Sequence, residues 1–156
     1  MKILIAVDES DASAAAVAAT RMLFPTADHV LLSVADMTPL MVADPVGGGV
    51  FTATTTPAAM EAVERSADTA IALAEHEITF IESKVEIGEP GRLICEEAAR
   101  IRPDVVVVGR SSRGWFSRLF EPSVADYVVK HAPCPVLVVK EPEHHEAAPD
   151  HQAPAD

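Results

Sequence analysis

The sequence is poor in the residues that cross-link a chain, anchor it in a membrane or give it positive charge. Its two cysteines, Cys95 and Cys134, form neither a CxxC pair nor a set with zinc-ligand spacing. No apolar run approaches the ~20 residues of a membrane span, and no signal-like stretch precedes the first apolar segment. Lys and Arg number 12 against 24 Asp and Glu, which excludes phosphate backbones and anionic membrane surfaces as general partners. We expect a cytoplasmic protein that binds neither nucleic acid nor membrane.

Aromatic residues are also scarce, at 4% of the chain, so the core must be aliphatic. Short apolar runs alternate with stretches of helical periodicity along the sequence. They predict strands at 2–7, 29–35, 78–87, 104–108 and 135–140, separated by helices at 12–24, 57–74, 91–101 and 124–131. Such an alternation implies right-handed crossovers. The predicted fold is therefore an α/β domain whose open parallel sheet carries helices on both faces.

Two segments depart from this alternation. Residues 36–56 are rich in Pro, Gly and Thr and contain Gly47-Gly48-Gly49, which predicts a long flexible loop within the domain. Residues 141–156 hold five acidic residues, no Lys or Arg and no large apolar residue, which is typical of a disordered tail. The sequence therefore predicts one domain over 1–140 and an acidic tail over 141–156.

Candidate binding residues follow two of the predicted strands. Ligands of open parallel sheets bind outside the carboxyl ends of the strands, where the strand order reverses. The first strand ends at Asp8, and the fourth is followed by Gly109-Arg110-Ser111-Ser112-Arg113, a positive segment in an acidic chain. Arginine forks and backbone N–H groups are suited to a phosphate. Two simpler interpretations stay open: the arginines balance neighbouring carboxylates, and Asp8 only caps a helix.

No catalytic or metal-binding constellation is evident. The chain has neither GxSxG nor HExxH, and the histidines of the tail stand among acidic residues, where solvation is the ordinary state. Asp8 is the one plausibly placed base for activating a nucleophile. The sequence therefore predicts no metal site and at most a slow ATPase.

Three segments together resemble the universal stress protein family: KILIAVDES at 2–10, DVVVVGRSSRGWFSRLFEPSVADYVV at 104–129 and KHAPCPVLVVK at 130–140. The resemblance covers about 2–140. It implies a Rossmann-like sheet of five parallel strands in the order 3-2-1-4-5 and a role in regulating the stress response. It also implies a homodimer that pairs the last strand, Pro135 to Lys140, across a two-fold axis. An unpaired apolar edge there would itself favour association.

Many members of that family bind ATP through a loop of the form G-x2-G-x9-G-S/T. Gly109 and Ser123 match this pattern, whereas Ser112 and Pro122 replace two of its three glycines. The loop is therefore degenerate, because Pro122 lacks an N–H and the Cβ of Ser112 narrows the approach.

The resemblance and the charge pattern together place an adenine nucleotide, ATP or AMP, with or without Mg²⁺, in a crevice between the first and fourth strands. The predicted nucleotide-binding residues are Ala6, Val7, Asp8, Val34, Gly109, Arg110, Ser111, Ser112, Arg113, Ser123 and Val124. The alternative is a protein-interaction module of the same fold that binds no nucleotide, since some members of the family lack the glycine pattern.

Overall fold

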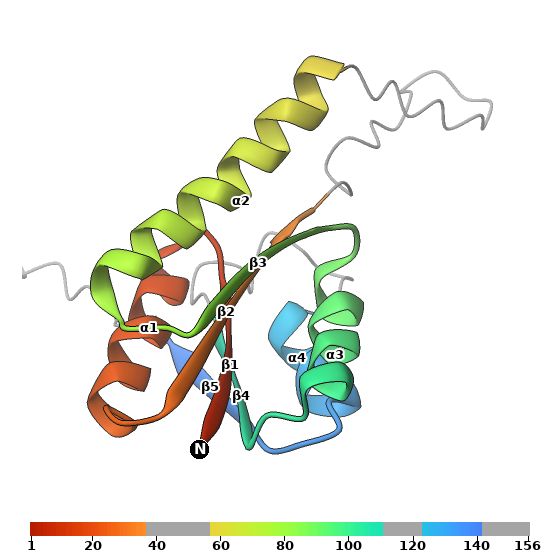
Figure 1. Cartoon of the computed structure of the whole chain (residues 1–156). Coiled ribbons are helices and arrows are strands. Elements are labelled where there is room, and N and C mark those ends of the chain that lie inside the picture. Colours follow the sequence, from red (N-terminus) through yellow and green to blue (C-terminus); the bar gives the residue numbers. More distant parts are fainter. Residues whose placement is uncertain (37–56, 111–122, 142–156) are drawn as a thin grey trace, which may run out of the picture.

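The computed structural model describes residues 1–36, 57–110 and 123–141. Strands and helices alternate through these residues (Figure 1). The elements are β1 Lys2–Val7, α1 Asp11–Leu23, β2 Asp28–Ala35, α2 Pro57–Glu77, β3 Glu82–Ile87, α3 Pro90–Ile101, β4 Val105–Arg110, α4 Val124–His131 and β5 Val136–Lys140. The strands form one five-stranded sheet in the order β3-β2-β1-β4-β5, and every pair is parallel. This confirms the predicted fold class and strand order.

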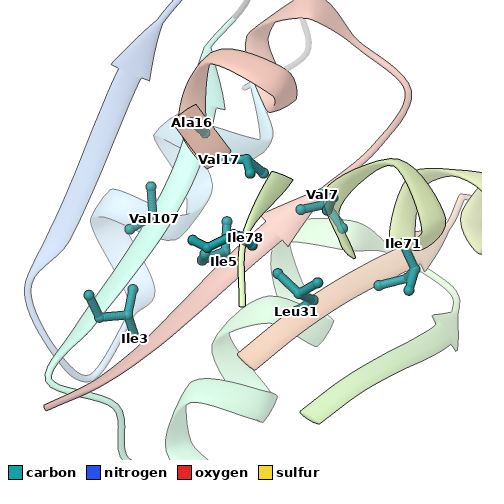
Figure 2. Close-up of a cluster of buried hydrophobic side chains, with 10 residues drawn as sticks. Ile3, Ile5, Val7, Ala16, Val17, Leu31, Ile71, Ile78 and Val107 are labelled. Carbon is teal, nitrogen blue, oxygen red and sulfur yellow. The ribbon is translucent and has the colours of Figure 1, made fainter. Parts of the chain in front are cut away.

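The helices form two layers, with α1 and α2 on one face of the sheet and α3 and α4 on the other (Figure 1). Each face has its own aliphatic core because successive side chains of a strand point to opposite sides. Figure 2 shows the core beneath α1 and α2, where Ile3, Ile5 and Val7 of β1 meet Leu31 of β2 and Val107 of β4. The core on the opposite face is built around Leu4, Val30, Leu32, Val106, Val108 and Ile94. β1, at the centre of the sheet, therefore contributes to both cores.

Polar side chains define where the helices begin. The hydroxyl of Ser10 accepts a hydrogen bond from the N–H of Ser13 at 3.1 Å and starts α1. The carboxylate of Glu89 accepts from two N–H groups at the start of α3, where Pro90 occupies the first helical position. Ser123 caps α4 through the N–H of Asp126 at 3.1 Å. Two of these helices thus begin at the edge of the sheet where β1 and β4 end.

The predicted third strand, 78–87, begins only at Glu82. Its first residues are apolar for another reason: Ile78 follows the end of α2 and is buried in the core beneath α1 and α2. The N–H of Ile81 then donates to the carbonyl of His29 at 2.9 Å, which brings the chain alongside β2. The single run predicted over 78–87 therefore contains the turn after α2 as well as the strand β3.

Three further differences concern helix and strand ends. β4 continues through Arg110 rather than stopping at Gly109, since Gly109 and Arg110 still pair with β5. α1 spans Asp11–Leu23 rather than 12–24, and Met22 and Leu23 near its end are exposed because its buried face is formed by smaller residues. Glu141, assigned to the tail, is buried, and its N–H donates to the carbonyl of Arg110 at 3.1 Å. The residues 37–56 and 142–156, predicted as a loop and a tail, lie outside the described residues.

Among the helices that the structure describes, none has both the length and the hydropathy needed to cross a membrane.

Candidate functional site

A cavity of about 420 Å³ opens at the carboxyl ends of β1, β2 and β4. This volume falls within the range of small-molecule sites. Six of the predicted nucleotide-binding residues line it: Ala6, Val7, Asp8, Val34, Gly109 and Val124. The structure therefore brings together residues from three strands and one helix that are up to 118 positions apart in the sequence (124 minus 6). The cavity lies where the strand order reverses about β1, the usual place for a ligand in an open parallel sheet.

The lining differs between the two faces of the sheet. Toward α3 and α4 it is apolar, formed by Leu32, Val34, Pro90, Ile94 and Val124, and we call this the apolar side. Toward α1 and α2 it is formed mainly by serines and alanines, and we call it the serine side. Its members are Ser10, Ser13, Ser33, Ser66, Ala67 and Ala70, together with Val7 and Val63. One ligand could thus pack an apolar part and hydrogen-bond a polar part.

Asp8 lies between the two sides and has two sets of partners. Its Oδ1 accepts hydrogen bonds from the N–H of Ser10 at 2.9 Å and from the Ser10 hydroxyl. Its own N–H donates to the hydroxyl oxygen of Ser13 at 3.0 Å. Asp8 therefore holds the N-cap residue of α1 in place but does not cap the helix itself, because the N-cap is Ser10. The side chain is also exposed at the cavity, so it is available to a hydroxyl or amine of a ligand.

Gly109 is required for a reason that the sequence did not indicate. A Cβ at this position would lie 2.4 Å from the carbonyl oxygen of Ala12 and 2.9 Å from the nitrogen of Ser13. These are backbone atoms in the first turn of α1, which packs directly on the end of β4. Glycine at position 109 thus allows α1 to pack directly against the end of β4. This packing positions the Asp8–Ser13 segment at the cavity.

Arg110 forms an ion pair with Asp126 of α4, with 3.2 Å between Nη1 and Oδ1. Arg110 thus balances a neighbouring carboxylate, as the simpler interpretation of this segment expected. Both side chains are about half exposed, and an exposed pair of this kind contributes only about 0–1 kcal/mol. A ligand phosphate could compete with Asp126 for this guanidinium at small cost.

Of the remaining predicted residues, Ser123 is described and does not line the cavity. Ser123 lies just before α4, and its hydroxyl caps that helix by accepting a hydrogen bond from the N–H of Asp126. Ser111, Ser112 and Arg113, and with them the degenerate phosphate loop, lie outside the described residues. The sequence reasoning missed Ser33, although it is the one polar residue within the apolar run VLLSVA of β2. A serine within a strand that is otherwise apolar is the feature that could have identified it from the sequence.

The cysteines and acidic clusters offer no second chemistry in the described parts of the chain. Burial raises the pKa of the Cys95 thiol, and burial likewise raises that of Cys134, so neither is an activated nucleophile. Over residues 1–36, 57–110 and 123–141, no group of three or more His, Cys, Asp or Glu side chains could hold a metal ion.

The strand order β3-β2-β1-β4-β5, with a cavity at the carboxyl ends of the central strands, defines a Rossmann-like α/β protein. Residues 1–140 match the Universal stress protein family, and the chain belongs to that family. The match extends over the whole of the predicted domain.

Similar proteins agree with this assignment. The chain is 42% identical over 66 residues to the Universal stress protein A-like protein of Arabidopsis thaliana, a match that spans 42% of this chain and 38% of that relative's length. In fold it resembles the hypothetical protein MJ0577, with a TM-score of 0.70, 19% identity and coverage of 91% and 96% of the two chains. A universal stress protein family protein from Arabidopsis thaliana, solved with AMP bound, has a TM-score of 0.61, 22% identity and coverage of 92% and 93%.

Proposed function

We propose that this protein is a stress-response regulator that binds an adenine nucleotide, foremost AMP, in the cavity at the ends of β1, β2 and β4. The observation that carries the proposal is the convergence of six predicted nucleotide-binding residues on one cavity of about 420 Å³. The relative solved with AMP bound has the same fold. Membership of the family supports the regulatory role.

The lining suggests how the nucleotide would lie. A purine ring is flat and largely apolar, and the apolar side offers Val34, Ile94 and Val124 for packing. The phosphate would then lie toward Gly109 and the start of α4, close to Arg110. No Lys, Arg or His is among the described residues that line the cavity. Each further phosphate adds charge for which the described lining supplies no cation, and this favours AMP over ATP.

Filling the mouth of the cavity provides the first test. Val124 lines the cavity and is 41% exposed, so Val124→Trp places a large ring at the mouth without displacing a buried side chain. We expect isothermal titration with AMP to give saturable heat for the wild type and at least a tenfold weaker affinity for Val124→Trp. Val129→Trp is the matched control, because Val129 belongs to the same helix, is 57% exposed and does not line the cavity.

The alternative, an interaction module without a nucleotide, is favoured by one observation. The guanidinium of Arg110 already pairs with Asp126, so the described residues leave this cation occupied. The two functions differ in the titration: if AMP, ADP, ATP and cyclic AMP all give no heat with the wild type, the nucleotide proposal is wrong and the interaction module stands.

We also propose a homodimer formed through β5, the strand predicted over Pro135 to Lys140. In the described sheet β5 pairs with β4 on one side only. Its apolar residues make an open edge that would favour pairing with a second copy. We expect sedimentation equilibrium to give a mass of about twice the 16.6 kDa of one chain. A mass of one chain at high micromolar concentration would exclude this dimer.

A further inference from the structure

Ser33 is a buried polar residue whose hydroxyl has no hydrogen-bond partner among the described residues. Only 1% of the residue is exposed, and yet it lines the cavity. Across the described parts of the chain, every fully enclosed side-chain nitrogen or oxygen has a partner. The hydroxyl of Ser33 must therefore open onto the cavity, where it can both donate and accept. A buried hydroxyl without a partner among the described residues points to a ligand.

A second buried serine, Ser13, lines the same cavity. The oxygen of Ser13 accepts a hydrogen bond from the N–H of Asp8 at 3.0 Å, and no described residue accepts the proton of this hydroxyl. Ser33 pairs in register with Val7, the residue before Asp8. Figure 2 shows Val7 among the residues that face α1 and α2. Ser13 and Ser33 thus lie on the same face of the sheet, on either side of the end of β1.

The residues that line the cavity near these two hydroxyls favour a ligand group that carries no negative charge. The face of α2 that lines the cavity carries Val63, Ser66, Ala67 and Ala70, and none of these side chains is charged. Of the described lining residues, the only charged ones are the acids Asp8 and Asp36. Because carboxylates repel phosphate and accept hydrogen bonds from hydroxyls, the serine side suits a neutral group that carries hydroxyls.

We propose that Ser33, assisted by Ser13, binds a ribose hydroxyl of the nucleotide and makes the site selective for ribonucleotides. This inference rests on the proposed function and adds a residue that sets its specificity. A ribose hydroxyl can donate to the oxygen of Ser33 and accept the free proton of Ser13. With the base on the apolar side, the sugar lies between Asp8 and the serine side, the place where these two hydroxyls are available.

The test compares AMP with 2′-deoxy-AMP and 3′-deoxy-AMP by isothermal titration. We expect the wild type to bind at least one of the deoxy analogues about three- to tenfold more weakly than AMP, the loss that one hydrogen bond represents. We expect Ser33→Ala to bind AMP more weakly by a similar factor and to lose the discrimination against that analogue. Ser83→Ala is the matched control: Ser83 is exposed on β3, donates to Glu75 at 3.2 Å and does not line the cavity.

Thermal unfolding separates a ligand role from a structural one. Ser33→Ala removes a hydroxyl that has no partner among the described residues, so the melting temperature of the free protein should not fall. A fall in melting temperature with unchanged AMP affinity would overturn the proposal and give Ser33 a structural role. Equal binding of AMP and both deoxy analogues to the wild type would overturn it while leaving the proposed function intact. No binding of AMP at all would overturn both.

Discussion

Replacing Gly109 with alanine is expected to lower the free energy of unfolding by about 3 kcal/mol, at the upper end of what overpacking costs. The added Cβ would lie 2.4 Å from the carbonyl oxygen and 2.5 Å from the carbonyl carbon of Ala12. Neither atom can move away alone, because both belong to the first turn of α1. Chemical denaturation followed by far-ultraviolet circular dichroism measures the loss directly.

Gly91→Ala is the matched control for this prediction. A Cβ at Gly91 would also lie close to other atoms, at 2.8 Å from the ring of Tyr127. Here the obstacle is the ring of one side chain rather than the backbone of a helix, so a turn of Tyr127 can relieve the contact at a smaller cost. We expect Gly91→Ala to lower the free energy of unfolding by about 1 kcal/mol, the lower end of what overpacking costs. If the two variants were equally stable, the contact of α1 with the end of β4 would not be the reason for glycine at 109.

The contact between α1 and Gly109 contributes to stability and also determines where residues that line the cavity lie. α1 reaches the end of β4 because Gly109 has no side chain, and the segment before α1 then holds Asp8 and Ser13 at the cavity. A glycine after an apolar strand is easily interpreted as room for a ligand. In this protein it first gives room to the helix whose start forms one wall of the site.

Much of the fold could be predicted because its signals are local. An apolar run such as KILIAV has few options other than a strand buried on both faces, and Ser10 and Pro90 mark helix starts by their own chemistry. The strand boundary at Glu82 could not be predicted, because Ile78 is apolar for a contact with distant residues of the core. Local patterns give the elements, whereas tertiary contacts decide where they end.

The candidate site likewise contains residues that could be predicted from the sequence and residues that could not. Asp8 and Gly109 stand directly after apolar strands, so topology alone places them at one edge of the sheet. The pairing of Arg110 with Asp126 depends on how α4 packs beside β4, which no motif records. Ser33 was missed because a serine inside a strand matches no motif. We assign it a role because it is buried at the cavity without a hydrogen-bond partner in the described parts of the chain, which only the three-dimensional structure reveals.

A network of charges connects β3 to α3 next to this site. Glu97 of α3 is buried, with 5% of its side chain exposed, and accepts hydrogen bonds from Arg100 Nε at 2.9 Å and Lys84 Nζ at 3.3 Å. Lys84 also pairs with Glu86, and Arg100 with Glu82 at 3.6 Å. The hydrogen bond from Arg100, helped by Lys84, holds the pKa of the Glu97 carboxyl below its usual value against the opposing effect of burial. The network fixes α3, which supplies Ile94 to the apolar side.

Glu97→Gln is therefore expected to lower the free energy of unfolding at pH 7 by about 2 kcal/mol, the contribution of hydrogen bonds to a charged group. A carboxyl whose pKa is lower in the folded state stabilises the fold fully above its unfolded pKa of about 4.3 and loses this contribution as the pH falls through the folded value. The difference between wild type and variant should thus be constant from about pH 7 to 5 and shrink below about pH 4. Urea unfolding at a series of pH values measures it.

Glu96→Gln is the matched control, one residue away on the same helix. Glu96 also pairs with an arginine, Arg92, but 57% of its side chain is exposed. An exposed pair within a helix contributes only about 0.3–0.5 kcal/mol, so this variant should stay close to the wild type at pH 7. If Glu97→Gln were equally harmless, or if its deficit persisted unchanged to pH 3, the ionised carboxylate of Glu97 would not be what joins β3 to α3. The position of α3, and with it the apolar side of the cavity, would then depend on the packing of apolar side chains and not on this charge network.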